Sequence, residues 1–259
     1  MTDPERAKRL LVTGGATGIG AASARLAARR GFAVGVNYRS QRERAEALVS
    51  ELRAGGAEAV ALAGDVSKED EVERLFRDFE RELGPVTALV NSAGVVPAPA
   101  RVAEARAADL AELVATNVLG TMLCCREAAR RMSTRSGGAG GVVVNVSSMA
   151  ATIGGRPGNS HYAASKAAID AFSLGFAKEV AREGIRVVSV RPGFTVTELT
   201  EARLGDAEFR RTLERTIPLG RPARVEEVAA PILWLLSDEA TFVSGATLDV
   251  SGGGFTLGS

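Results

Sequence analysis

The chain has 259 residues, of which 46% are hydrophobic and 24% charged, a balance that is ordinary for a globular protein. Its 32 Lys and Arg against 31 Asp and Glu give a formal net charge of +1, so no field of one sign favours nucleic acid or an anionic membrane as the main partner. We find no apolar run of signal-peptide type at the N-terminus and no uninterrupted apolar segment of the about 18 residues that a membrane helix needs. The adjacent Cys124 and Cys125 lack metal-site spacing, so we expect a soluble, cytoplasmic protein with two core cysteines and no bound metal.

Seven short β-branched runs, each bounded by Gly, Asn, Asp or Pro, alternate along the chain with longer segments of helical periodicity. The short runs are typical of strands buried in a parallel sheet, and the longer segments, such as Glu43–Arg53 and Val72–Leu83, are predicted to be helices. Repeated βαβ units predict a Rossmann-type, doubly wound parallel sheet of the α/β class with helices on both faces. The glycine-rich stretch 133–141 is interpreted as a flexible surface loop, so we expect a single domain over residues 1–259. The predicted strands are Leu10–Thr13, Ala33–Asn37, Ala57–Ala63, Thr87–Asn91, Val142–Ser147, Arg186–Arg191 and Thr247–Val250.

A glycine-rich turn follows the first predicted strand and precedes a helix of small residues. Gly14, Gly18 and Gly20 have the spacing Gly-x-x-x-Gly-x-Gly. A pyrophosphate can approach the backbone closely only where side chains are absent, and the start of a helix offers free N–H groups and a partial positive charge. The turn therefore predicts a dinucleotide phosphate site, with a plain glycine-rich loop as the alternative.

The end of the second predicted strand indicates which dinucleotide binds. A site specific for NAD usually places a carboxylate there, to bind the adenosine ribose hydroxyls. This chain has Tyr38, Arg39 and Ser40 instead, with Arg42 close by. A guanidinium can bind a 2′-phosphate through two charge-assisted hydrogen bonds. We therefore expect NADP(H) to be preferred, with NAD(H) as a second usable cofactor; the alternative is that Arg39 is an exposed surface charge.

The candidate catalytic groups lie in the stretch 145–167. Tyr162 and Lys166 are four residues apart and share one face of a predicted helix. A neighbouring ammonium favours the phenolate, so we expect the pKa of Tyr162 to fall from its ordinary value of about 10 toward the range of general acid/base catalysis. Ser148 follows a predicted strand, where its hydroxyl can bind a substrate oxygen. His161, beside Tyr162, is interpreted as pocket wall or surface.

In chain order these motifs resemble those of the short-chain dehydrogenase/reductase family, and the resemblance covers essentially the whole chain. Two departures stand out. The stretch between Ser148 and Tyr162 is one residue longer than in many relatives, and Thr17 stands where many NADP-preferring relatives carry a basic residue. The matching elements are Thr13-Gly14-x-x-x-Gly18-x-Gly20, Asp65-Val66, Asn91-Ser-Ala-Gly94, Asn117, Ser148, Tyr162-x-x-x-Lys166 and Pro192-Gly193-x-x-x-Thr197.

The resemblance implies a role for each matching position. Tyr162 would donate a proton to a carbonyl oxygen, Ser148 would orient that carbonyl, and Lys166 would bind the nicotinamide ribose and tune Tyr162. Asn117 would anchor a water that passes protons to Lys166, and the segment 196–218 would form a lid over the substrate. The implied cofactor contacts, with Asp65 and Val66 at the adenine and Val196 and Thr197 at the carboxamide, are Gly14, Thr17, Gly18, Ile19, Gly20, Tyr38, Arg39, Ser40, Asp65, Val66, Asn91, Ala93, Gly94, Tyr162, Lys166, Pro192, Gly193, Val196 and Thr197.

The activity implied by the resemblance is NADP(H)-dependent interconversion of a carbonyl and a secondary alcohol by hydride transfer. A 3-oxoacyl thioester or a small ketone is the expected substrate, with a sugar, as for glucose 1-dehydrogenases, as the alternative. Arg130 and Arg131 could contribute to docking an acyl carrier. An NADP-binding regulator without catalysis is the non-enzymatic alternative. The resemblance also implies a homotetramer, with helices around 117–132 and 162–182 and the C-terminal strand at its interfaces.

Overall fold

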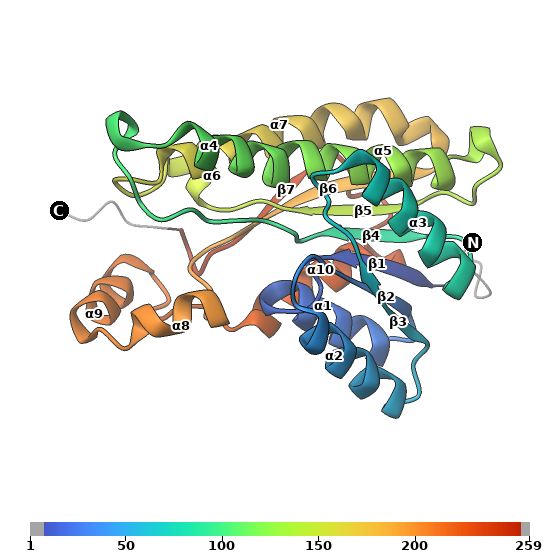
Figure 1. The fold of residues 1–259 in the computed structure, drawn as a ribbon, viewed down its shortest axis with the longest axis horizontal. Coiled ribbons are helices and arrows are strands. Elements are labelled where there is room, and N and C mark those ends of the chain that lie inside the picture. Colours follow the sequence, from blue (N-terminus) through green and yellow to red (C-terminus); the bar gives the residue numbers. More distant parts are fainter. Residues whose placement is uncertain (1–7, 255–259) are drawn as a thin grey trace.

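Seven parallel strands form one sheet at the centre of the computed structural model, which describes residues 8–254 (Figure 1). The strand order β3-β2-β1-β4-β5-β6-β7 shows that the chain builds outward from β1 on one side and then on the other. The predicted Rossmann-type, doubly wound sheet is confirmed, and every strand agrees with its predicted range to within two residues at either end. The strands are β1 (Arg9–Thr13), β2 (Ala33–Tyr38), β3 (Ala59–Ala63), β4 (Ala88–Asn91), β5 (Gly141–Val146), β6 (Ile185–Pro192) and β7 (Thr247–Val250).

Helices cover both faces of this sheet, as predicted. One face carries α1 (Gly18–Arg29), α2 (Arg42–Ala54) and α10 (Val225–Leu235) (Figure 1). The other face carries α3 (Glu69–Leu83), α5 (Thr121–Met132) and α7 (Ser160–Val180). The remaining helices are α4 (Ala107–Val114), α6 (Ala150–Ile153), α8 (Glu198–Leu204) and α9 (Ala207–Thr216). Residues 1–7 and 255–259 of the predicted domain lie outside the described part of the chain.

The strands are apolar throughout because both of their faces are buried. Successive side chains of a strand point to opposite faces, so Leu10 and Val12 pack with α1 and α2 while Leu11 packs with α3. All three side chains are fully buried. Burial of such a side chain contributes roughly 1.5–3 kcal/mol, which makes the two apolar layers the main stabilising element of the fold.

The glycine-rich stretch 133–141 is a surface loop with two closely packed glycines. It contains a 3₁₀ turn, Thr134–Ser136, whose N-cap is the Ser133 side chain. A Cβ at Gly138 would lie 2.4 Å from the Arg131 carbonyl oxygen, and one at Gly140 would lie 2.4 Å from the Gly184 carbonyl oxygen. Gly138 and Gly140 are therefore needed for close backbone approach. Residues 134–137 and Ala139 are exposed, so the stretch lies on the surface, as predicted.

One continuous helical stretch, Ala107–Met132, is long and apolar enough to cross a membrane by length and composition, with a mean hydropathy of 1.3 in its most apolar window. The stretch contains Asp109 and Glu112, so it is not the uninterrupted apolar segment that the sequence was expected to lack. A single such helix is weak evidence, because core helices of globular proteins meet the same criterion. Leu123, Cys124 and Ala128 of this stretch pack into the apolar layer beside α3 and α7, so we interpret it as a core helix.

The sheet register brings the predicted motifs together at the carboxyl ends of the strands. Thr13 of β1 is level with Asn91 of β4, which is level with Asn145 of β5 and then Ser189 of β6. Because the strands are parallel, their carboxyl ends all meet at this edge, where ligands bind in open α/β sheets. The polar residues at the strand ends therefore surround one site.

Candidate active site

The glycine turn between β1 and α1 is packed too tightly to accept side chains. Gly14 has φ +59°, and a Cβ there would lie 2.7 Å from Ala93 Cα. A Cβ at Gly20 would lie 2.4 Å from the Gly14 carbonyl oxygen. The Gly18 N–H, at the start of α1, donates a hydrogen bond to the Glu198 carboxylate at 3.2 Å. An anion of this chain thus already lies where the turn was predicted to bind phosphate, which shows that the position suits negative charge.

Two polar residues at strand ends hold this turn in place, and the sequence reasoning did not assign them. The Asn37 amide donates to the Gly64 carbonyl at 2.9 Å and accepts from the Gly14 N–H at 3.3 Å. The Thr13 hydroxyl accepts the Ala93 N–H at 3.2 Å. Both residues close an otherwise apolar strand, and that placement was the available signal.

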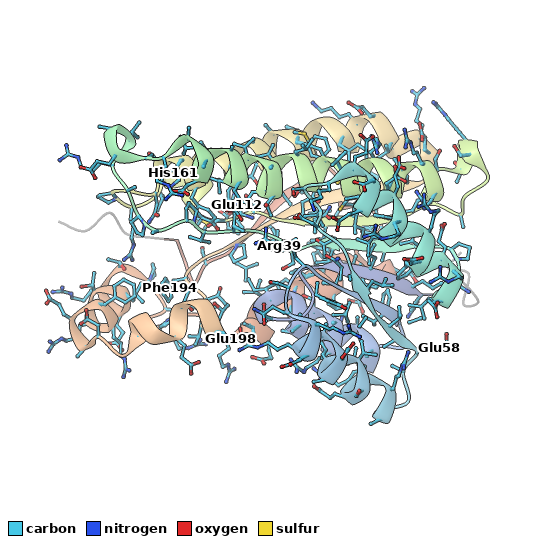
Figure 2. The ribbon with its side chains drawn as sticks, in the orientation of Figure 1. Arg39, Glu58, Glu112, His161, Phe194 and Glu198 are labelled. Carbon is cyan, nitrogen blue, oxygen red and sulfur yellow. The ribbon has the colours of Figure 1, made fainter. Side chains whose placement is uncertain are left out.

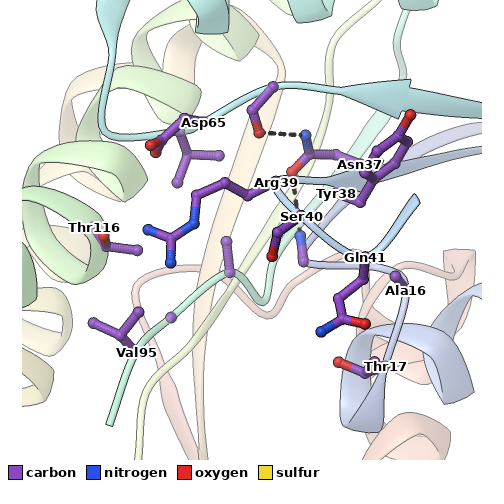
Figure 3. Close-up of a pocket in the computed structure, with 15 residues that line it drawn as sticks. Ala16, Thr17, Asn37, Tyr38, Arg39, Ser40, Gln41, Asp65, Val95 and Thr116 are labelled. Carbon is purple, nitrogen blue, oxygen red and sulfur yellow. Dashed lines mark hydrogen bonds between the residues drawn. The ribbon is translucent and has the colours of Figure 1, made fainter. Parts of the chain in front are cut away.

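A pocket opens beside the turn, between the ends of β1, β2, β3 and β4 (Figure 3). Among the described residues that line it, Arg39 is the only cation and Asp65 the only carboxylate. The Thr116 hydroxyl is buried there and has no hydrogen-bond partner in the described structure, so it is available to a ligand. Nine predicted cofactor residues line the pocket: Gly14, Thr17, Tyr38, Arg39, Ser40, Asp65, Val66, Ala93 and Gly94. The sequence reasoning missed Ala16, Asn37, Gln41, Gly64, Val95 and Thr116.

The predicted catalytic side chains gather at the carboxyl end of β5. The Ser148 hydroxyl lies near enough to the Tyr162 phenol to lower its pKa. The Lys166 ammonium lies 6.0 Å from the centre of the Tyr162 ring and donates to the Val146 carbonyl at 2.8 Å. Tyr162 and Lys166 lie one turn apart on α7, as predicted, so Ser148, Tyr162 and Lys166 surround one point.

Burial decides the proton affinities of this group. It raises the pKa of Tyr162, and the nearby Ser148 hydroxyl only partly offsets the rise. It also lowers the pKa of Lys166 to about 8, against the opposing charge of Asp170. The expectation of a lowered pKa for Tyr162 was therefore wrong for the polypeptide alone, because desolvation of the phenol dominates and the opposing contribution comes from Ser148. The phenol holds its proton at neutral pH.

Asn117 lies beside this group in a π-helical turn, Ala115–Gly120, between α4 and α5. Its side chain accepts from the Val95 N–H at 2.8 Å and donates to the Ser165 hydroxyl at 3.2 Å. A Cβ at Gly94 would lie 3.3 Å from the Asn117 side-chain oxygen and 3.7 Å from the Lys166 nitrogen. Glycine at this position therefore lets Asn117 and Lys166 approach the same space, and π-helical turns are frequent at functional sites.

The other predicted cofactor residues lie around the pocket without lining it. Asn91 is buried beneath it, where its amide donates to the Asn145 side chain at 2.8 Å. The Val196 N–H donates to the Ala223 carbonyl at 2.8 Å, so that backbone donor is already engaged. A Cβ at Gly18 would lie 3.3 Å from the Thr197 methyl group. Ile19 and Gly20 begin α1, Pro192 ends β6, and the backbone of Gly193 packs against Ser251.

Comparison with known proteins places this arrangement in a family. A family model described as enoyl-(acyl carrier protein) reductase matches residues 14–255. A short-chain dehydrogenase/reductase structure from Serratia marcescens superposes with a TM-score of 0.89 at 30% identity, covering 97% of this chain and 99% of that one. The chain belongs to the short-chain dehydrogenase/reductase family.

Proteins similar to this chain are named as oxidoreductases, reductases or dehydrogenases. YgfF of Escherichia coli, named as an uncharacterised oxidoreductase, is 42% identical over 94% of this chain and 98% of its own length. A human 3-oxoacyl-[acyl-carrier-protein] reductase is 39% identical over 93% of this chain and 95% of its own length. A Burkholderia cenocepacia short-chain dehydrogenase solved in complex with NADP has a TM-score of 0.87 at 30% identity, covering 95% and 97% of the two chains. This chain is an NAD(P)-dependent dehydrogenase/reductase, so the alternative of a non-catalytic regulator is set aside.

The segment 196–218 of this short-chain dehydrogenase/reductase contains α8 and α9, which follow the end of β6 (Figure 1). Phe209 of α9 packs edge-on against Phe194, with ring centres 5.6 Å apart. The Arg156 guanidinium lies 5.4 Å from the centre of the Phe209 ring. The Arg156 contact joins the segment to the loop between Ser148 and Tyr162.

Two carboxylates at the site were not foreseen. Glu198 binds the Gly18 N–H, and Glu112 of α4 lies 3.3 Å from Arg39 at the end of β2 (Figure 2). Glu112 is 73 residues from Arg39 in sequence, and no local pattern marks either carboxylate.

The two cysteines are buried side by side in the core, as predicted, and burial raises the pKa of Cys125 to about 12. Such a thiol stays protonated and unreactive at neutral pH. Between residues 8 and 254, no group of three or more His, Cys, Asp or Glu gathers in a way that could hold a metal ion. His161 is partly buried, and its Nδ1 atom has no partner among the described residues.

Proposed function

We propose that this protein is an NADP(H)-dependent reductase that interconverts a carbonyl and a secondary alcohol, with Tyr162 as its general acid/base. The observation that carries the proposal is the grouping of three side chains, with the Ser148 hydroxyl near enough to the Tyr162 phenol to lower its pKa and the Lys166 ammonium 6.0 Å from the centre of the ring. A protonated phenol beside a second hydroxyl can donate hydrogen bonds to the oxygen of a substrate carbonyl.

The residues of the pocket fit a nicotinamide dinucleotide. The glycine turn offers the Gly18 N–H, whose present partner is a carboxylate, as a donor to the pyrophosphate. Arg39 is the one cation among the described pocket residues and would hold a 2′-phosphate, while the unpartnered Thr116 hydroxyl is available to the adenosine moiety. When bound, the cofactor supplies or accepts the hydride. These features support NADP(H) as the preferred cofactor, with NAD(H) as a second one.

The chain's own groups then manage the proton. Tyr162 donates its proton to the carbonyl oxygen as the alcohol forms, and the Ser148 hydroxyl binds the same oxygen. Its pKa of about 8 makes Lys166 able to give and take a proton near neutral pH. Asn117, fixed between Val95 and Ser165, holds the backbone beside Lys166 in position.

For the substrate we propose a 3-oxoacyl thioester or a small ketone, with a glucose-type sugar as the alternative. Support for the thioester comes from the relatives named as 3-oxoacyl-[acyl-carrier-protein] reductases. Against a carrier docked on Arg130 and Arg131, both arginines already bind the buried Glu127 carboxylate, and Arg131 also binds Glu80 at 3.1 Å. These ion pairs make Arg130 and Arg131 less available to dock an acyl carrier.

Replacement of Tyr162 by Phe tests the proposal. The variant is expected to lose about 10²- to 10⁴-fold in turnover while binding NADPH as the wild type does. The assay follows NADPH oxidation with acetoacetyl-CoA and small ketones, and NADP⁺ reduction with glucose for the alternative substrate. Ser148→Ala should lose turnover in parallel. Undiminished turnover in Tyr162→Phe would remove this residue from the mechanism.

We further propose a single cytoplasmic domain whose segment 196–218 acts as the substrate lid, assembled as a homotetramer. Large apolar side chains exposed on the surface support the assembly. Val114 on α4 is 53% exposed, Leu174 on α7 is 45% exposed, and Phe242 near β7 is fully exposed. Trp234 on α10 is also exposed, which leaves interface packing rather than core packing as its proposed role. Multi-angle light scattering is expected to give the mass of four chains, and a monomer mass would contradict this assembly.

A further inference from the structure

The guanidinium assigned to the 2′-phosphate already has a partner on the opposite side of the pocket. Arg39 Nη1 lies 3.3 Å from Glu112 Oε1, so the end of β2 is joined to α4. Figure 3 shows the Arg39 side chain extended across the pocket toward the wall that carries Thr116. The two side chains are 47% and 57% exposed, so a ligand entering from solvent can reach the pair.

This pairing differs from those of the neighbouring arginines. Arg42 binds Glu46 at 2.7 Å within α2, one helical turn away. Arg44 lies 4.0 Å from Glu198, near the glycine turn. Arg39 alone among these three lines the pocket, and its carboxylate partner belongs to an element on the facing wall. A 2′-phosphate bound to Arg39 would therefore come close to the Glu112 carboxylate.

We propose that Glu112 sets the preference between NADP(H) and NAD(H) by competing with the 2′-phosphate for Arg39. This inference rests on the proposed function, in which Arg39 binds that phosphate. A phosphate must take the guanidinium from Glu112 and then remain beside its negative charge, and both steps weaken the binding of NADP(H). NAD(H) has a hydroxyl at the same place and leaves the Arg39–Glu112 pair intact. Glu112 is thus a specificity-determining residue that keeps NAD(H) usable.

The expected effect is moderate, because both side chains are exposed to solvent. Exposed ion pairs contribute little, and repulsion between Glu112 and a phosphate of about two negative charges adds to the competition. Removal of the carboxylate should therefore tighten NADP⁺ binding by about three- to tenfold at low ionic strength. Salt at about 0.5 M should reduce the gain, since it screens charges more than a few ångströms apart.

The test compares Glu112→Gln with the wild type in titrations of NADP⁺ and of NAD⁺. Glutamine keeps the shape of the side chain and loses its charge. We expect the Kd for NADP⁺ to fall by about three- to tenfold and the Kd for NAD⁺ to stay unchanged. Asp109→Asn is the matched control, because Asp109 is an exposed carboxylate on the same helix that pairs with Arg106 at 2.9 Å instead. It should change neither affinity.

Arg39→Ala separates failure of this inference from failure of the assignment beneath it. If Arg39→Ala leaves the Kd for NADP⁺ unchanged, the proposed phosphate site is wrong and the role of Glu112 falls with it. If Arg39→Ala weakens NADP⁺ but Glu112→Gln fails to tighten it, only the competition is refuted. If Glu112→Gln tightened the binding of NADP⁺ and of NAD⁺ equally, the inference would also be overturned. That result would reflect a general effect of the protein's net charge on anionic ligands and not competition for Arg39.

Discussion

Lys166 holds an amine in the protein interior, and we expect this to lower the stability of the fold. The side chain is 7% exposed, and burial lowers its pKa from 10.5 to about 8. At about 1.4 kcal/mol per pH unit, the folded state disfavours the protonated amine by about 3 kcal/mol at neutral pH. Lys166→Met removes that cost but leaves the Val146 carbonyl without its donor, a loss of about 1–2 kcal/mol. The variant is therefore expected to unfold with a free energy about 1–2 kcal/mol higher than the wild type.

The stability gained by Lys166→Met should depend on pH in one direction. When the pKa of an amine is lower in the folded state than in the unfolded state, the amine destabilises the fold. The full free-energy cost applies at any pH below the folded-state pKa. That cost is relieved as the pH rises from about 8 to 10.5. The advantage of the variant should thus be largest at neutral pH and should shrink as the pH rises toward 10.5. Above that pH the wild-type amine is neutral in both states, and the lost hydrogen bond to the Val146 carbonyl should leave the variant the less stable protein.

Urea unfolding of the cofactor-free proteins at neutral and at alkaline pH, followed by circular dichroism, measures this difference. Lys178→Met is the control, since Lys178 is an exposed lysine on the same helix and its loss should change stability by less than about 0.5 kcal/mol. Turnover should be lost in Lys166→Met, as stability and activity oppose each other at such sites. A variant less stable than the wild type at neutral pH, or a gain that does not vary with pH, would refute the reasoning.

Burial raises the pKa of Tyr162, so carbonyl reduction, which needs the phenolic proton, should hold its rate into mildly alkaline pH while alcohol oxidation speeds up as the pH rises. Initial rates in both directions across pH check this, and a reduction rate that climbs with pH would contradict it. Gly20→Ala would place a Cβ 2.4 Å from the Gly14 carbonyl oxygen. We expect weaker NADPH binding and a free energy of unfolding about 1–3 kcal/mol lower, measured by titration and urea unfolding. Glu198→Gln keeps an acceptor for the Gly18 N–H and removes its charge, so NADP⁺ and NAD⁺ should both bind about two- to threefold tighter in titrations. Unchanged affinities would show that this carboxylate does not compete with the pyrophosphate.

The sheet was predictable because its signals are local. Apolar runs of strand length alternate with amphipathic segments, and burial on both faces of a parallel sheet demands that pattern. The candidate residues were predictable for the same reason. Tyr162 and Lys166 are one helical turn apart, and Gly14, Gly18 and Gly20 stand within one turn of the chain, so their spacing alone indicates what they can do.

Other features depend on how distant elements pack. Arg39 meets Glu112 only because β2 ends opposite α4, and Gly18 meets Glu198 only because the segment after β6 returns to the first turn. The pKa of Tyr162 was predicted in the wrong direction, because a short spacing reveals the neighbouring amine but not the burial of the phenol, which raises its pKa. Desolvation and long-range ion pairs are properties of the assembled surroundings. For this protein the sequence therefore determined the family, the sheet and the candidate catalytic side chains, and the tertiary structure decided their charge partners and proton affinities.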